Sequence, residues 1–194
     1  MRRNPERQPD LGPTLSRLRD HLIEFSVKRG DFVLKSGRRS DWFIDGKQTA
    51  CRPEGILLIA EAMLERLDPT VTALGGLTMG ADPVAYGVAA VAATRGRHLR
   101  AFSIRKEAKG HGVAGRVAGA LLRGDRVAVV EDVVTRGLSP MEAVEVVREF
   151  GAEPVVVMPV VDRGGTCADL AAAAGVEFRP LLTAPELGLD YQGA

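Results

Sequence analysis

Residues 126–140 read RVAVVEDVVTRGLSP, and this segment carries the clearest structural signal in the chain. Its residues 127–130 form an apolar and mostly β-branched run, the pattern of a strand buried on both faces of a parallel sheet. Glu131 and Asp132 follow directly. Two adjacent carboxylates beside a buried strand are costly unless cations or hydroxyl groups satisfy them, so the pattern favours a ligand-binding edge.

A loop with hydroxyl groups and a glycine follows the acidic pair. Residues 135–139 read TRGLS, and residues 141–150 have the apolar spacing of a helix packed on a sheet. Ser139 with Glu142 three residues later predicts a capping box, and Pro140 suits a first helical turn. Such a loop offers free N–H groups and the positive end of the helix dipole to an anion, most naturally a phosphate. The alternative is an ordinary βα turn with a chance acidic pair.

The stretch resembles the phosphoribosyl pyrophosphate (PRPP) motif of the type I phosphoribosyltransferases. The resemblance implies that the acidic pair engages the ribose hydroxyls, with Asp132 as a catalytic residue, and that loop amides hold the 5-phosphate. The implied PRPP-binding residues of this stretch are Glu131, Asp132, Val133, Val134, Thr135, Arg136, Gly137, Leu138 and Ser139. Arg136 and Leu138 depart from the family pattern, which has small or polar residues there. We expect their bulk to change the loop geometry or its affinity.

Length and composition fit one globular domain. The 194 residues are 45% hydrophobic and 26% charged, which is enough for a proper core. With 26 basic and 25 acidic residues, the net charge of +1 gives no reason to expect nucleic acid or a membrane as partner. Cys51 and Cys167 are expected to be reduced, and the chain opens without an apolar leader. We therefore predict a cytoplasmic protein.

The chain alternates between predicted strands and helices. Residues 1–13 are expected to form a flexible arm and residues 14–194 a single domain. Helices are predicted at 14–28 with Gly30 as the stop, and at 53–67, 81–93, 141–150 and 169–174. Strands are predicted at 31–34 and 41–45, and at 71–74, 99–104, 127–130, 155–161 and 178–182. The last five predict an α/β fold with a central, mainly parallel five-stranded sheet flanked by helices.

An N-terminal hairpin combines cations with aromatic rings. Residues 32–45 read FVLKSGRRSDWFID, which is either a solvated edge or a ligand lid. The segment resembles the N-terminal part of orotate phosphoribosyltransferases, where it belongs to a small hood, here mainly residues 30–50. The resemblance implies that Lys35 binds orotate and that Trp42 and Phe43 lie against its planar ring. Plain hydrophobic packing is the alternative for the two rings.

A glycine-rich stretch, GGLTMGADP, spans residues 75–83. Its glycines would let the backbone approach a ligand, although a tight βα turn explains them equally well. The stretch resembles the pyrophosphate loop of one group of orotate phosphoribosyltransferases. It lacks the lysine of another group, so pyrophosphate contacts are expected from backbone amides or from elsewhere.

Residues 105–112, RKEAKGHG, have the highest density of charge. The run resembles the RKxxKxHG signature of the orotate family; a solvated charged loop is the alternative. In that family the loop reaches the active site of the neighbouring subunit, which implies a homodimer with shared active sites. The residues implied to bind pyrophosphate are Arg105, Lys106, Lys109 and His111, with Lys106 and Lys109 as catalytic residues. Residues 116–122 are compatible with an extended flank behind this loop.

Arg163 follows the strand predicted at 155–161. The resemblance implies that Arg163 and Thr135 bind orotate, while a structural ion pair of Arg163 with Asp162 or Glu177 is the alternative.

The resemblance covers roughly residues 20–185 and implies an enzyme of de novo pyrimidine synthesis. Ribose 5-phosphate would pass from PRPP to orotate with Mg²⁺, giving orotidine 5′-phosphate and pyrophosphate. Mg²⁺ is expected to be held mainly by PRPP, with Glu131 and Asp132 nearby. Two other functions stay open: a phosphoribosyltransferase for another nucleobase, and a non-catalytic regulator that binds PRPP.

Overall fold

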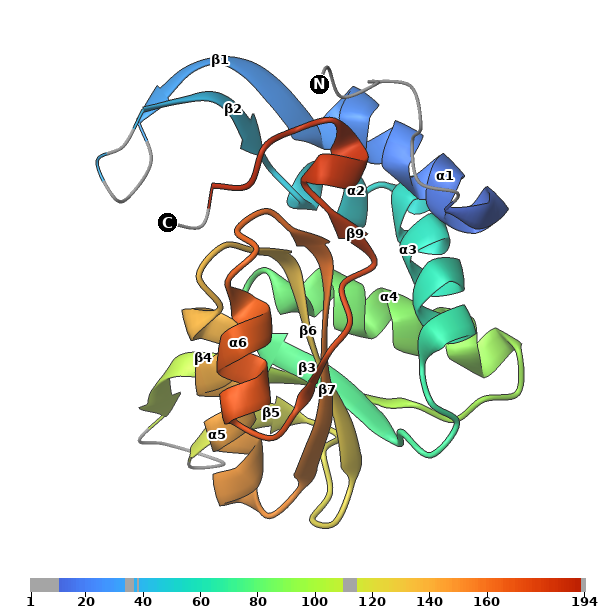
Figure 1. The fold of residues 1–194 in the computed structure, drawn as a ribbon. Helices are drawn as coiled ribbons and strands as arrows, with labels where there is room; N and C mark the ends of the chain where they lie inside the picture. Colours follow the sequence, from blue (N-terminus) through green and yellow to red (C-terminus); the bar gives the residue numbers. More distant parts are fainter. Residues whose placement is uncertain (1–10, 34–36, 38, 110–114, 193–194) are drawn as a thin grey trace.

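The computed structural model describes residues 11–33, 37, 39–109 and 115–192. Two layers of helices enclose a twisted sheet, and a two-stranded hairpin projects from one end (Figure 1). The chain enters through helix α1 (Gly12–His21) and a π-helical turn (Leu22–Ser26). The hairpin pairs β1 (Val27–Val33) antiparallel with β2 (Arg39–Ile44). The short helix α2 (Lys47–Ala50) then leads into α3 (Pro53–Arg66).

The main sheet confirms the predicted α/β class with mainly parallel strands. Its strands are β3 (Ala73–Leu77), β4 (Arg100–Lys109), β5 (Gly115–Gly119), β6 (Arg126–Val134), β7 (Glu153–Asp162), β8 (Glu177–Phe178) and β9 (Leu182–Thr183). In the described residues their order is β5-β4-β3-β6-β7-β8, and β9 pairs with the end of β7. The β4–β5 pair is antiparallel and the other pairs are parallel. The parallel strands therefore end together, next to the hairpin (Figure 1).

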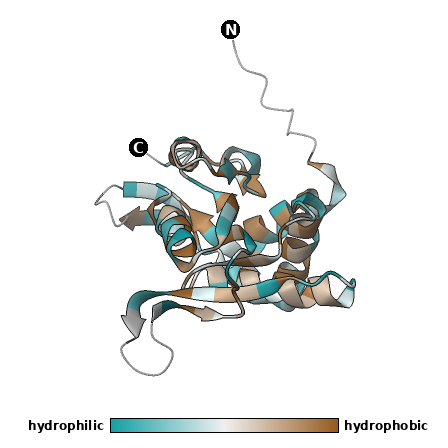
Figure 2. Ribbon diagram, turned by 90° about the horizontal axis from the view of Figure 1, so that it is seen from below, coloured by the Kyte–Doolittle hydropathy of each residue, from teal (hydrophilic) through white to brown (hydrophobic). Residues whose placement is uncertain are grey.

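Helices cover both faces of the sheet. Helices α3 and α4 (Ala81–Thr94) pack over one face, while α5 (Leu138–Phe150) and α6 (Cys167–Ala173) lie on the other side. A 3₁₀ turn, η2 (Pro185–Leu187), follows β9. Each face has its own cluster of buried apolar side chains, because the continuous apolar strands are covered on both sides. Figure 2 shows the hydrophobic colours concentrated on the inner strands and on the inward sides of the helices.

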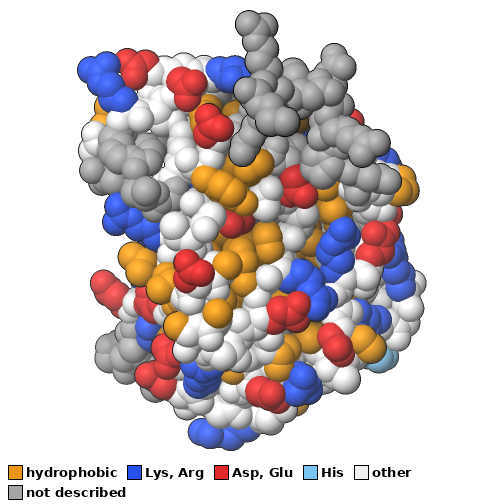
Figure 3. Space-filling view, in the orientation of Figure 1, with side chains coloured by type: hydrophobic (Ala, Val, Ile, Leu, Met, Phe, Trp, Pro, Cys, Tyr) orange, Lys and Arg blue, Asp and Glu red, His pale blue; other side chains and the backbone are white. Residues whose placement is uncertain are grey.

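The surface carries both signs of charge, and Figure 3 shows apolar side chains in the middle of one face with Lys, Arg, Asp and Glu interspersed around them. None of the described helices is long and apolar enough to cross a membrane.

Several predicted boundaries at the N-terminal half are wrong. The first helix begins at Gly12, inside the predicted arm, and helical structure ends at Ser26 rather than Lys28. Gly30 is a residue of β1, not a helix stop. β3 continues through Gly75 and Gly76, beyond the strand predicted at 71–74. A Cβ at Gly75 would lie 2.8 Å from the ring of Phe102, so these glycines let neighbouring strands approach.

Further corrections concern the C-terminal half. β6 continues past the acidic pair to Val134, because the ladder with β7 runs to Asp162. The capping box is wrong: α5 is capped by Gly137 in the left-handed region, with φ of 84°, so Ser139 lies within the helix. The strand predicted at 178–182 is two short strands. The extended flank expected at 116–122 is confirmed as the antiparallel strand β5, although β5 spans only Gly115–Gly119.

Candidate active site

The acidic pair is buried at the end of the central strand β6. Glu131 and Asp132 are only 8% and 6% exposed. The backbone N–H of Val133 donates to Oδ1 of Asp132 at 2.8 Å, and the N–H of Asp132 donates to Oε1 of Glu131 at 3.2 Å. These local bonds fix the direction of both carboxylates but leave most of their acceptor capacity unused.

A lysine that the sequence reasoning did not single out meets this pair. Lys47 Nζ, from α2, lies 2.8 Å from Oδ2 of Asp132. Partial burial lowers the pKa of Lys47, but the hydrogen bond and charge of Asp132 outweigh this and raise the pKa above its ordinary value. Burial, and secondly the charge of Asp132, raise the pKa of Glu131 to about 8. At neutral pH the raised pKa therefore favours the protonated form of Glu131, next to the pair of Asp132 with Lys47.

The loop between β3 and α4 closes tightly on the two carboxylates. A Cβ on Gly80 would lie 2.6 Å from Oδ1 of Asp132 and closer still to Oε1 of Glu131. A Cβ on Gly46 would lie 2.9 Å from Cβ of Asp132. Backbone without side chains thus borders the acidic pair on two sides, and this brings the glycine stretch predicted for pyrophosphate next to the predicted ribose site.

The loop after β6 presents free backbone donors. The N–H groups of Thr135, Arg136 and Gly137 have no acceptor within the described part of the chain, and the first turn of α5 adds further free N–H groups. Gly137 is required here because its φ is positive and because a Cβ would lie 2.7 Å from Sγ of Cys167. The side chains of Arg136, Leu138 and Ser139 are exposed. The two departures from the family pattern therefore leave the backbone of the loop open to an anion.

Arg163 lies at the end of β7 under the hood. It is 5% exposed, and its guanidinium carbon is 4.9 Å from the Trp42 ring centroid and 5.6 Å from that of Phe43. Burial lowers the pKa of Arg163, and its Nε has no partner among the described residues. The predicted orotate-binding residues Arg163, Trp42 and Phe43 are thus brought together, and within one chain the rings pack on the arginine.

The ion-pair alternative for Arg163 is contradicted. Oδ1 of Asp162 accepts the N–H groups of Gly164 and Gly165, both at 3.0 Å. Glu177 pairs with Arg179 instead.

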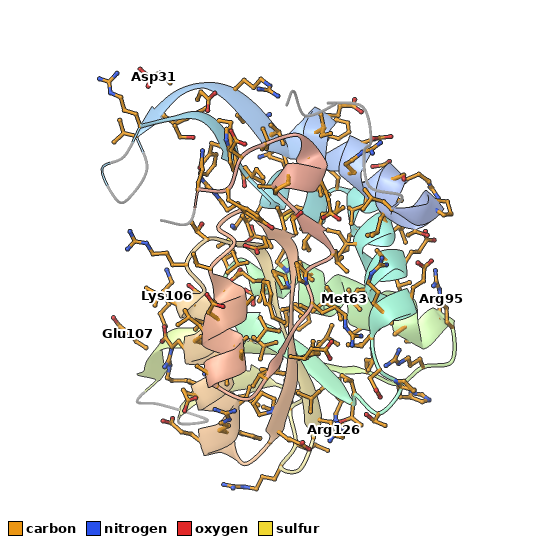
Figure 4. The ribbon with its side chains drawn as sticks, viewed as in Figure 1. Asp31, Met63, Arg95, Lys106, Glu107 and Arg126 are labelled. Atoms are coloured by element: carbon orange, nitrogen blue, oxygen red, sulfur yellow. The ribbon has the colours of Figure 1, made fainter. Side chains whose placement is uncertain are left out.

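The described part of the basic run, residues 105–109, lies on the outer part of β4, which pairs with β5. The guanidinium of Arg116 binds the carbonyl of Arg105 at 2.8 Å and pairs with Glu142 on α5. Lys106 is exposed, forms no hydrogen bond or ion pair with another described residue, and points outward with Glu107 (Figure 4). The structure therefore does not bring Arg105 and Lys106 onto the acidic pair of their own chain.

Some predicted residues cannot be placed. Lys35 and His111 lie outside the described residues, as does the side chain of Lys109. In the described ranges no group of three or more His, Cys, Asp or Glu side chains is placed to hold a metal ion.

A cavity of about 520 Å³ lies between the β1–β2 hairpin and the C-terminal segment. Trp42, Ser40 and Gln192 are among the residues that line it, and the acidic pair is not.

Comparison with known proteins assigns the family. No family model matches the chain. The orotate phosphoribosyltransferase of Streptomyces avermitilis is 44% identical over 181 residues, covering 92% of this chain and 97% of that protein. That of a Nostoc species is 40% identical over 184 residues, covering 94% and 89%. This chain belongs to the orotate phosphoribosyltransferase family.

Solved structures agree with this orotate phosphoribosyltransferase assignment. The Mycobacterium tuberculosis enzyme in complex with Fe(III) dicitrate superposes with a TM-score of 0.81 at 37% identity, covering 91% of this chain and all of that one. The same enzyme in complex with PRPP gives 0.76 at 34% identity, with the same coverage. Adenine phosphoribosyltransferase from Leishmania donovani gives 0.64 at 15% identity, which shows the type I fold alone. The chain is thus a phosphoribosyltransferase enzyme with the predicted fold.

Sequence reasoning missed four residues of this orotate phosphoribosyltransferase site. Gly80 lies in the glycine-rich stretch at residues 75–83, and Lys47 is a cation shortly after the hairpin, so both had a local signal. Gln192 meets Arg163, and Ser40 meets Gln192, only through the tertiary fold. The sequence of the C-terminal segment has no pattern that predicts its position next to Arg163.

Proposed function

We propose that this chain catalyses transfer of ribose 5-phosphate from PRPP to orotate, giving orotidine 5′-phosphate and pyrophosphate in pyrimidine synthesis. The observation that carries the proposal is the buried acidic pair at the end of β6, followed by a loop with free N–H groups. The names of the relatives and the PRPP complex of the M. tuberculosis enzyme support it.

The acidic pair suits the ribose of the donor. As pyrophosphate leaves, positive charge develops on the sugar, and carboxylates aimed at its hydroxyl groups stabilise that charge. Asp132 is paired with Lys47 Nζ at 2.8 Å, and the buried Glu131 lies directly beside it in the chain. The N–H groups of Thr135 to Ser139 suit the 5-phosphate, because they lie at the N-terminus of α5.

Arg163 suits the base. Orotate carries a carboxylate and carbonyl oxygens on a flat ring, and a guanidinium supplies donors in a fixed fork. Trp42 and Phe43 already pack on Arg163, so a planar base inserted at this place would contact both a cation and aromatic faces. Thr135 and Lys35 are the other proposed contacts of the base.

Magnesium fits the residues present. Two adjacent carboxylates bordered by glycine backbone form a cradle that a Cβ at Gly80 would fill. Mg²⁺ prefers oxygen ligands, keeps several waters and is usually bound by one or two carboxylates together with phosphates. Glu131 and Asp132 are the residues proposed to lie near it, and when bound it neutralises charge on the diphosphate.

We also propose a homodimer in which the β4–β5 hairpin serves the partner's site. Lys106 points outward from its own chain, and so it is available to a second subunit (Figure 4). Lys106→Ala and Asp132→Ala chains, each inactive alone, should regain activity when mixed. No recovery in mixed dimers would show that each site uses its own lysine.

The function is tested by measuring pyrophosphate release with PRPP, Mg²⁺ and each of orotate, uracil, adenine and hypoxanthine. Release with orotate alone supports the proposal. Release with another base supports a phosphoribosyltransferase of different specificity. Binding of PRPP without release with any base would show a non-catalytic regulator.

A further inference from the structure

The C-terminal segment reaches the arginine on the base side of the site. Figure 1 shows this segment, in red, passing between the hairpin and the edge of the sheet. The backbone N–H of Gln192 donates to the carbonyl of Arg163 at 2.9 Å. The side chain of Gln192 contacts both the guanidinium of Arg163 and the hydroxyl of Ser40. One amide therefore joins hood strand β2 to the end of β7.

The chemistry of the three groups fixes how the amide is turned. A guanidinium has donors only, so the carbonyl oxygen of Gln192 faces the terminal nitrogen of Arg163. The Ser40 hydroxyl donates to the carbonyl of Trp42 at 2.5 Å, so it accepts from the amide nitrogen of Gln192. In this network Nε of Arg163 is the buried donor that finds no acceptor in the part of the chain described.

The position of Gln192 is set by its neighbour as well as by Arg163. The Tyr191 ring lies against Gly165, where an added Cβ would be 3.1 Å from three ring carbons. Gly165 lies two residues after Arg163, and its N–H donates to Oδ1 of Asp162 at 3.0 Å. The C-terminal segment is thus seated on the loop that carries Arg163, and its seat does not depend on the Gln192 side chain.

We propose that Gln192 is a positioning residue for the acceptor base. It binds one terminal nitrogen of Arg163 and anchors the amide on Ser40, so that the guanidinium is held beneath Trp42 with Nε left for an acceptor atom of the base. The inference rests on the proposed function. Its physical basis is preorganisation: an arginine that is already fixed loses less conformational entropy when the base binds. An uncompensated buried N–H is also costly, which favours a ligand that accepts from it.

The test compares Gln192→Ala and Gln192→Met with the parent chain. Methionine keeps the length and packing of the side chain but removes both hydrogen bonds. We expect both variants to raise KM for orotate about tenfold, because a hydrogen bond to a charged group is lost. KM for PRPP should stay within about twofold, since the phosphate loop and acidic pair are untouched. Thermal unfolding shows whether each variant is folded. If Gln192→Ala is not folded, the comparison of Gln192→Met with the parent chain is the test.

Gln48→Ala is the matched control. Its exposed side chain donates to Asp45 at 3.2 Å and makes no contact with Arg163, so this substitution should leave both KM values unchanged. A parental KM for orotate in Gln192→Met would overturn the inference. A KM lower than the parent's would also overturn it, by showing that the segment obstructs the base. A parent chain that consumes no orotate would refute the proposed function itself, so the two failures are distinguishable.

Discussion

Gly80→Ala tests whether the acidic pair must keep its exact surroundings to bind PRPP. Gly80 has an ordinary helical φ of −63°, so alanine brings no backbone strain and the effect is steric. The new Cβ would lie 2.6 Å from Oδ1 of Asp132, and an ordinary contact begins at 3.4 Å. The carboxylate must therefore move by about 0.8 Å, and the carboxylate of Glu131 by more. Both groups are buried, which leaves little room for such movement.

A displacement near 1 Å in a catalytic constellation costs on the order of 100-fold. We therefore expect Gly80→Ala to weaken PRPP binding in the presence of Mg²⁺ at least 30-fold, about 2 kcal/mol. Titration calorimetry measures this directly, and the unfolding curve shows whether the variant is folded.

Gly87→Ala is the matched control for this prediction. Gly87 lies on the same helix α4, and its Cβ would be 2.5 Å from Cδ1 of Ile56 rather than near a carboxylate. It should change the free energy of unfolding and leave the affinity of the folded protein for PRPP within about twofold. Equal loss of affinity in both variants, or no loss in Gly80→Ala, would refute the reasoning.

Three other substitutions test single features of the site. Lys47→Met should lower the free energy of unfolding by no more than about 1 kcal/mol, because the Lys47 side chain is 41% exposed and its ion pair with Asp132 is screened by solvent. Urea titration measures this free energy, and a loss above about 3 kcal/mol would contradict the prediction. Glu131→Gln should remove a pH dependence of stability: the folded chain holds a proton between the ordinary pKa of 4.5 and about 8, so the parent loses stability as pH rises through this window and the variant does not. Identical slopes of stability against pH would show that Glu131 is ionised throughout. Arg136→Thr should change PRPP affinity by less than about twofold, because the side chain is exposed; a larger gain or loss would show that its bulk shapes the loop.

The sequence was sufficient to place the acidic pair on a buried strand and Arg163 after another strand. The apolar run before Glu131 and Asp132 predicted a buried strand ending at a ligand, and Arg163 followed the same logic on β7. Both predictions need only the order of residues along the chain, a strand followed by a polar side chain. Neighbouring parallel strands end at the same edge of a sheet, so the residues that follow them come together.

The parts that failed depend on distances across the fold. Ser139 has the chemistry of an N-cap, but the turn at Gly137 starts α5 earlier, so the cap lies elsewhere. Lys47 meets Asp132 across 85 positions of sequence, and Gln192 meets Ser40 across 152. No periodicity or motif encodes such meetings, because they follow from how the hairpin and the last segment pack on the finished sheet.

The central claim is that the buried acidic pair holds the ribose while the bond to pyrophosphate breaks. It is tested most directly by following the loss of orotate absorbance with PRPP and Mg²⁺ for the parent and for Asp132→Asn, which keeps the size of the side chain. We predict turnover by the parent and a fall in kcat/KM of at least about 100-fold in the variant, because a carboxylate that stabilises developing positive charge is lost. Equal rates of orotate consumption in the two proteins would contradict the claim.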